Sequence, residues 1–173
     1  MLVNKVAAIK PNDRILVHAA AGGVGHLLVQ AAKGMGGMVI GTVGSEDKAE
    51  VATKLGCDHI ILYRKEKVLD RVMEITDGQG LEIVYDSVGK ETFHDSLDCL
   101  DFNGQLVVYG QSSGPIEDFE IPMLAKKSLT LSRPMIFHYT RKRSNLIKMS
   151  KSCLLYTSPS PRDQRGSRMP SSA

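Results

Sequence analysis

Short runs of apolar, mostly β-branched residues alternate along the chain with longer segments in which apolar residues recur every three or four positions. The short runs predict buried strands, because a strand covered on both faces carries apolar side chains on both. Bounded by turn residues, five such strands are predicted, at residues 14–18, 38–43, 59–62, 81–85 and 105–109.

The segments between these strands predict helices. The helix after the first strand ends at the glycine-rich residues 34–37, because glycine readily adopts the left-handed conformation of a helix stop. Further helices are predicted within residues 46–55, 68–75 and 93–100. Ser45 is expected to cap the first of these three.

Strands that alternate with helices of this length predict an α/β fold, a truncated Rossmann-type, doubly wound parallel sheet with helices on both faces. Residues 124–131 are expected to add one helical turn and a sixth strand. Each glycine- or serine-rich loop follows a strand, so all of these loops should open on one edge of the sheet. Ligands of such sheets bind at that edge.

The loop after the first strand has the pattern Ala20-x-Gly22-x-x-Gly25. A strand that turns through glycines into a helix presents backbone N–H groups and the positive end of a helix dipole, which suits a dinucleotide pyrophosphate. Small residues also serve tight packing turns, but the flanking strand and helix favour the cofactor interpretation.

Length, charge and cysteine content narrow the function classes. A chain of 173 residues suffices for one domain with a core. The net charge of +3 falls to +1 without Arg162, Asp163, Arg165 and Arg168, so nucleic acid or a membrane surface is not expected as a partner. Cysteines without paired spacing and the lack of a signal peptide predict a cytoplasmic protein.

The composition changes abruptly at Cys153, where Ser, Pro and Arg become frequent. Residues 153–163 and 167–173 correspond in frame to two pieces of a sequencing-library adapter, whereas a disordered tail is the alternative. We therefore expect an NADP-binding domain fragment at residues 1–150 and a non-native tail, translated adapter, at residues 151–173.

Five blocks carry a family resemblance, at residues 16–25, 41–44, 84–90, 109–114 and 133–134. Together they resemble the quinone oxidoreductase (ζ-crystallin-like) branch of the medium-chain dehydrogenase/reductases, in the order of that family and over roughly the first 150 residues. The resemblance implies the nucleotide-binding domain of a zinc-independent NADPH:quinone oxidoreductase whose substrate domain lies outside this chain.

The choice of cofactor is argued from charge. An NAD site usually has an acidic residue at the end of the second strand, on the ribose 2′-hydroxyl. Here that strand ends at Gly44-Ser45, while Glu46 and Asp47 are expected to begin a helix. Lys48 can reach a 2′-phosphate together with Ser45, although most lysines are simply solvated.

The resemblance implies that Lys48 and Tyr63 flank the 2′-phosphate of NADPH, and that the loops after the fourth and fifth strands line the ribose and nicotinamide. The predicted cofactor-binding residues are Ala21, Gly22, Gly23, Val24, Gly25, Gly44, Ser45, Lys48, Tyr63, Ser87, Val88, Gly89, Tyr109, Gly110, Gln111 and Ser112.

No residue of this chain is predicted to be catalytic or to bind a metal. His18 lies in strand position before the phosphate loop and is expected to pack or hydrogen-bond locally. The other histidines lack the spacing of metal ligands.

The expected reaction is hydride transfer from NADPH to a quinone or similar electron-poor carbonyl. Two alternatives stay open, an enal or enone reductase of the same superfamily and a non-enzymatic NADPH-binding module. The whole protein is expected to be a homodimer, and this fragment alone is expected to be inactive.

Overall fold

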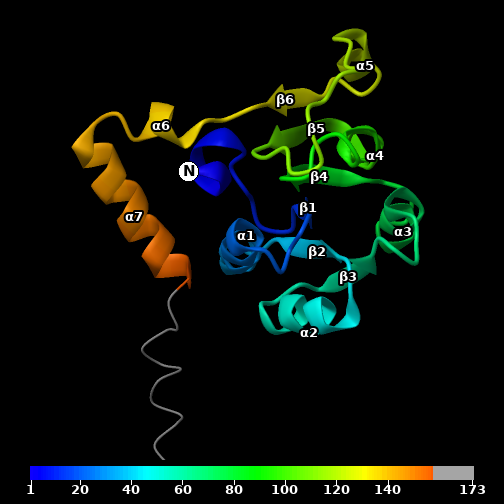
Figure 1. The fold of residues 1–173 in the computed structure, drawn as a ribbon, viewed down its shortest axis with the longest axis horizontal. Coiled ribbons are helices and arrows are strands. Elements are labelled where there is room, and N and C mark those ends of the chain that lie inside the picture. Colours follow the sequence, from blue (N-terminus) through cyan, green and yellow to red (C-terminus); the bar gives the residue numbers. More distant parts are fainter. Residues whose placement is uncertain (158–173) are drawn as a thin grey trace, which may run out of the picture.

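The computed structural model describes residues 1–157 and contains a parallel sheet with helices on both sides (Figure 1). The predicted tail therefore lies outside the described residues from position 158 onward. Its first part belongs to the long C-terminal helix α7 (Arg143–Thr157), which contacts α1 (Gly23–Gly34).

Six strands form the sheet in the order β3-β2-β1-β4-β5-β6, with every neighbouring pair parallel. This is the strand order of the doubly wound dinucleotide-binding fold, so the predicted fold class is confirmed. The strands are β1 (Arg14–Val17), β2 (Met38–Val43), β3 (His59–Leu62), β4 (Leu81–Asp86), β5 (Leu100–Val108) and β6 (Thr130–Ser132).

The remaining elements connect these strands or flank the sheet. They are η1 (Leu2–Val6), α2 (Glu46–Lys54), α3 (Val68–Ile75), α4 (Phe93–Asp98), α5 (Pro122–Ala125) and α6 (Ile136–Tyr139). Figure 1 shows η1 and α1 on one side of the sheet and α3 and α4 on the other. The single helical turn and the sixth strand expected within residues 124–131 correspond to α5 and β6.

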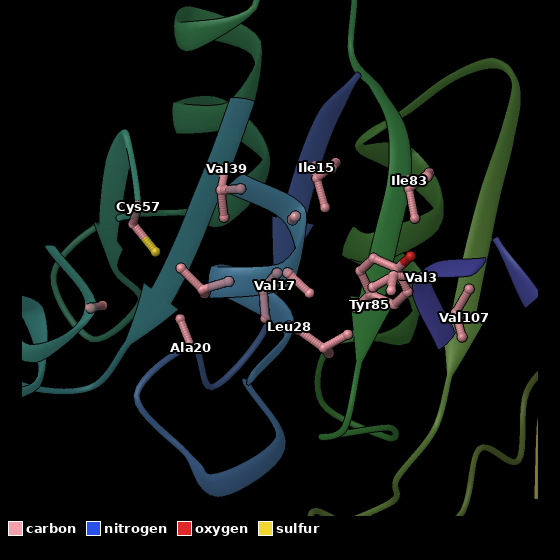
Figure 2. Packing of buried hydrophobic residues seen from close by; sticks show 14 of the residues in the cluster. Val3, Ile15, Val17, Ala20, Leu28, Val39, Cys57, Ile83, Tyr85 and Val107 are labelled. Atoms are coloured by element: carbon pink, nitrogen blue, oxygen red, sulfur yellow. The ribbon is translucent and has the colours of Figure 1, made fainter. Parts of the chain in front are cut away.

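Alternating side chains of the central strands enter two separate hydrophobic cores. In β1, Ile15 and Val17 pack toward α1, while Leu16 packs on the opposite face with residues of α3 and α4. Figure 2 shows side chains from β1, β2, β4 and β5 gathered in the first of these cores. Both faces are apolar because both are covered, which explains the continuous apolar runs of the sequence.

The segment before β1 is part of the first core. Val3 and Ala7 are buried in it, and the hydroxyl of Tyr85 on β4 donates a hydrogen bond of 3.1 Å to the carbonyl of Ala7. Burial raises the pKa of Tyr85. The first residues are thus bound to the centre of the sheet, and Figure 2 includes both Val3 and Tyr85.

Two local predictions are wrong. Leu100 was expected on the fourth helix, but it begins β5 and pairs with Leu81. The register then shifts, because β5 contains extra residues before Gln105, the partner of Ile83. Ser45 does occupy the N-cap position of α2, yet its side chain makes no capping hydrogen bond.

Candidate functional site

The carboxyl ends of the strands bring the predicted loops to one edge of the sheet, as the parallel arrangement requires. The loop after β1 lies next to the end of β2, where the N–H of Ala20 donates to the carbonyl of Thr42 at 3.1 Å. The loops after β4 and β5 are joined to each other as well. Every predicted cofactor residue therefore lies in or beside a loop of this edge.

The loop between β1 and α1 is shaped by close backbone contacts. Ala19 has a positive φ of 51°, and the N–H of Gly22 donates to its carbonyl at 2.8 Å. A Cβ at Gly25 would lie 2.3 Å from that same carbonyl oxygen, so only glycine fits there. At Gly23, in contrast, a Cβ would meet no atom within 4 Å.

The N-terminus of α1 is open to a ligand. No side chain caps it, and Gly22, Gly23 and Val24 are exposed. The first N–H groups of a helix have no partner within the helix, and they carry the positive end of its dipole. This arrangement is suited to an anion such as a pyrophosphate.

A second corner of the edge is formed where β2 and β3 end. The hydroxyl of Tyr63 lies 2.6 Å from the position of a Cβ on Gly44, so the ring packs across this glycine. Ser45 and Lys48 are exposed at the start of α2. Glu46 forms an ion pair with Lys65 at 2.5 Å, and it lies in the first helical turn with Asp47, as expected.

The loops after β4 and β5 lock together through main-chain contacts. The N–H groups of Ser112 and Ser113 donate to the carbonyls of Ser87 at 3.1 Å and Val88 at 2.9 Å. A Cβ at Gly110 would lie 2.6 Å from the carbonyl oxygen of Ser87. Gly89 has a φ of +89° and lies against Gln111, so this contact also depends on glycine.

Side chains strengthen this pair of loops. The hydroxyl of Ser113 donates to the carbonyl of Val88 at 2.7 Å, and Arg133, beyond β6, donates to the side chain of Gln111 at 3.1 Å and to the carbonyl of Val108 at 3.2 Å. Burial raises the pKa of Tyr109, with a hydrogen bond to Ser87 acting in the opposite direction. The two loops are therefore joined by side-chain as well as main-chain hydrogen bonds at the sheet edge.

The sequence interpretation did not assign a role to Asp86, Thr92 or Ser96. The fully buried carboxylate of Asp86 accepts hydrogen bonds from the N–H groups of Val88 at 2.7 Å and Gly89 at 3.0 Å. Its other oxygen accepts from Thr92 at 2.7 Å and Ser96 at 3.1 Å. The sequence signal that could have indicated this role of Asp86 is an acidic residue directly at the end of an apolar strand.

His18 lies beneath the loop between β1 and α1 and not in an open site. It is buried, and its ring nitrogens lie 3.1 Å from the hydroxyl of Thr42 and 3.0 Å from that of Ser96. Burial lowers its pKa, while the negative charges of Asp86 and Asp95 act in the opposite direction. The predicted local hydrogen bonding of His18 is confirmed.

Comparison with known proteins identifies the family. Residues 23–152 match the zinc-binding dehydrogenase family. The chain belongs to the zinc-binding dehydrogenases. Within this family its relatives include quinone oxidoreductases, which confirms the branch that the sequence blocks resemble.

Two curated relatives illustrate the similarity. The 2-haloacrylate reductase of a Burkholderia species is 44% identical over 155 residues, covering 88% of this chain and 46% of the relative. Quinone oxidoreductase 1 of Escherichia coli is 43% identical over 150 residues, covering 86% and 46%. The chain thus spans about half the length of these curated relatives.

Solved structures of quinone oxidoreductases agree with this assignment. The E. coli quinone oxidoreductase complexed with NADPH superimposes with a TM-score of 0.85 at 42% identity, covering 91% of this chain and 49% of that one. The quinone oxidoreductase of Pseudomonas syringae pv. tomato also has a TM-score of 0.85, at 40% identity and with coverage of 89% and 48%.

Within residues 1–157, no three His, Cys, Asp or Glu side chains converge as ligands of a metal ion. Among the same residues, no helix has both the length and the apolar character that a bilayer span requires.

Proposed function

We propose that this chain binds NADPH along the carboxyl edge of its sheet. The loop before α1 carries the proposal, because Gly25 lets the helix approach Ala19 closely while Gly23 and Val24 are exposed in the first turn, where helix N–H groups have no partner within the helix. Ala21, Gly22, Gly23, Val24 and Gly25 would hold the pyrophosphate. The NADPH complex of the E. coli relative, with a TM-score of 0.85, supports this choice of dinucleotide.

The 2′-phosphate would bind at the corner formed by Gly44, Ser45, Lys48 and Tyr63. Glu46, the acidic residue nearest the end of β2, forms an ion pair with Lys65, so its carboxylate already has a cationic partner. Lys48 forms no ion pair within the described residues and is exposed beside Ser45. A cation and a hydroxyl at this corner favour NADPH over NADH.

The ribose and nicotinamide would lie along the joined loops after β4 and β5. The residues proposed to line them are Ser87, Val88, Gly89, Tyr109, Gly110, Gln111 and Ser112. When bound, NADPH supplies a hydride from C4 of its nicotinamide, and the residues of these loops position the ring for transfer.

We infer that the whole protein reduces quinones or similar electron-poor carbonyls. Quinone oxidoreductases from several organisms are 36–44% identical to this chain, which supports the inference. Since the chain spans about half of their length, the substrate would also contact a part outside it. We assign no acid–base catalyst to the chain. On the same resemblance we propose a cytoplasmic homodimer.

A second candidate is the reduction of an activated carbon–carbon double bond. It is favoured by the 2-haloacrylate reductase that is 44% identical to this chain, because an acrylate is an α,β-unsaturated acid. The nucleotide edge would be the same for both reactions, so the difference between them would lie in the substrate pocket. An NADPH-binding module without activity is the third candidate.

The proposal is tested with the 173-residue chain and with its complete reading frame. We expect the chain to bind NADPH weakly and to oxidise none of it with a quinone. We expect the complete protein to oxidise NADPH with 1,4-benzoquinone faster than with 2-chloroacrylate. The reverse order would favour the second candidate, binding without turnover the third, and an absence of NADPH binding in the complete protein would refute all three.

A further inference from the structure

A hydrogen-bonded network of buried polar side chains crosses the sheet beneath the candidate cofactor edge. It contains His18, Thr42, Asp86 and Ser96, each of which is 2% exposed or less. These residues come from the end of β1, from β2, from β4 and from α4, so the network joins both halves of the sheet. Among described residues, no buried side-chain nitrogen or oxygen lacks a hydrogen-bond partner.

The direction of each hydrogen bond follows from the chemistry of the groups. The Asp86 carboxylate can only accept, so the Ser96 hydroxyl donates to it at 3.1 Å. Ser96 then accepts from Nε2–H of His18 at 3.0 Å, which makes Nδ1 the unprotonated nitrogen of the neutral ring. Nδ1 accepts from the hydroxyl of Thr42 at 3.1 Å.

Each end of this hydrogen-bonded network is bonded to the backbone of a different loop. At one end, the hydroxyl of Thr42 accepts from the N–H of Ala19 at 3.3 Å, next to the strained turn of the phosphate loop. At the other end, the Asp86 carboxylate accepts from the N–H groups of Val88 and Gly89. The loop for the pyrophosphate and the loop for the nicotinamide half are therefore connected through His18.

Filling a core with a hydrogen-bonded network of this kind costs free energy. Buried polar groups lose their hydration, and apolar side chains of similar volume would pack there without that loss. Every donor and acceptor is instead matched, which gives the network one defined geometry. The network holds the backbone of two loops, the one after β1 and the one after β4, and both loops belong to the same proposed ligand site.

We propose that the Asp86–Ser96–His18–Thr42 network sets the spacing between the loop at residues 19–25 and the loop at residues 87–89, and so aligns the two halves of NADPH. The proposal rests on the proposed function, because it assigns these loops to one cofactor. The four side chains are positioning residues, since they contact backbone and each other and lie below the surface that the cofactor would touch.

Two ligands of different length separate this role from general stability. NADPH would span both loops, whereas 2′,5′-ADP would reach the corner at Lys48 and Tyr63 and, through its 5′-phosphate, the loop at residues 19–25, but not the loop at residues 87–89. Ser96→Ala interrupts the network but leaves the bonds from Asp86 to its own loop in place. We expect about a tenfold weaker binding of NADPH, the equivalent of one hydrogen bond, with binding of 2′,5′-ADP unchanged within about twofold.

Two further variants make the test independent of folding defects. Thr42→Val interrupts the network at its other end while keeping the volume of the side chain. Because it also removes the acceptor of the Ala19 N–H, we expect both ligands to bind more weakly, with the larger loss for NADPH. Thr76→Val is the matched control, because Thr76 is also a buried hydroxyl that bonds a backbone N–H, of Gly80, but at the opposite edge of the sheet. Its ratio of the two affinities should equal that of the wild type.

The measurements are titrations of the 173-residue chain followed by NMR, together with the ¹⁵N pattern of His18. The Nε2-protonated tautomer is expected in the wild type and is expected to be perturbed in Ser96→Ala. Equal losses for both ligands, or no loss for either, would overturn the positioning role alone. If the wild type binds 2′,5′-ADP but not NADPH, or neither, the proposal that this chain binds NADPH fails, and the positioning role fails with it.

Discussion

The two ends of the strands in this sheet are stabilised by different interactions. Where the strands begin, Arg14 forms ion pairs with Glu82 at 2.5 Å and Asp101 at 3.0 Å, and Lys33 pairs with Asp58 at 2.8 Å. Where the strands end, the loops are held by glycine contacts, main-chain hydrogen bonds and a buried chain of mostly uncharged groups around Asp86.

This difference between the two edges implies that the amino edge contributes to stability, whereas the carboxyl edge contributes to ligand binding. Charged side chains can occupy the amino edge because no ligand is proposed there, and their pairing links the starts of strands that are distant in sequence. The carboxyl edge has to leave backbone N–H groups available, so its shape depends on close approach of backbone to backbone. Variants at the amino edge should therefore alter stability alone, whereas variants at the carboxyl edge should alter ligand affinity.

Gly25→Ala is expected to have the largest effect. Its Cβ would lie 2.3 Å from the carbonyl oxygen of Ala19, so the loop must move away from α1. We expect a loss of about 2–4 kcal/mol in the free energy of unfolding, measured by urea denaturation, and a loss of NADPH binding. Gly23→Ala is the control, because its Cβ meets nothing within 4 Å, and it should keep full stability. Equal stability of the two variants would contradict the close-contact argument.

Arg14→Met tests the opposite edge. Removal of the guanidinium leaves Glu82 and Asp101 half-buried without their partner, which should lower the free energy of unfolding by about 1–3 kcal/mol. Affinity for NADPH should stay within about twofold, the equivalent of a few tenths of a kcal/mol. A matching loss of affinity would show that the two edges are coupled.

A control for this variant is Lys54→Met. Lys54 pairs with Glu50 at 3.9 Å on the exposed surface of α2, and both side chains are more than 70% exposed. Such pairs contribute about 0–1 kcal/mol, so denaturation of this variant should be close to that of the wild type.

Lys48→Glu asks whether charge also contributes at the carboxyl edge. With a carboxylate beside Ser45, we expect NADPH to bind about 10–100-fold more weakly, since a charge-assisted contact is replaced by repulsion. The binding of NADH should change much less. Lys54→Glu makes the same charge change on the same helix and should affect neither cofactor. Equal losses of NADPH and NADH in Lys48→Glu would remove this residue from the 2′-phosphate corner.

The smallest expected effect is a dependence of the free energy of unfolding on pH, which arises from His18. Its pKa is lowered in the folded chain by burial and is about 6.5 in the unfolded chain, so the unfolded chain binds the extra proton first. Stability should be fully present above pH 6.5 and should fall as the pH drops below it, by at most about 1.4 kcal/mol per pH unit.

His18→Gln should flatten this slope in thermal unfolding curves recorded between pH 7.5 and 5.5. His94, which is exposed on α4, provides the comparison, and His94→Gln should retain the slope. A slope that survives in His18→Gln would mean that another group carries it.

Much of the fold could be predicted because its strands are buried on both faces. The bounds of β2 and β3 match the prediction at every residue, since apolar runs between turn residues define strand ends well. The loops of the candidate site were predictable for a related reason. Once the strands are parallel, every loop that follows a strand must open on the same edge.

The contacts between distant residues could not be predicted in this way. Ser96 and His18 are 78 positions apart, and nothing in the local pattern of either residue indicates the other. The early start of β5 at Leu100 was missed because it depends on pairing with Leu81 of β4, ahead of an irregular stretch of β5 that interrupts the apolar pattern. Ser45 has the residue type and the position of a cap, but a capping bond also requires a side-chain rotamer that sequence does not specify.

The bond from Tyr85 to the carbonyl of Ala7 has a consequence for where this folding unit begins. Strand positions alone would place its first residue at Arg14, and the family match begins later still, at residue 23. The buried side chains of Val3 and Ala7 place the boundary before η1. A chimera that exchanges this unit with a relative should therefore be joined upstream of Leu2, so that donor and acceptor of this bond descend from the same parent.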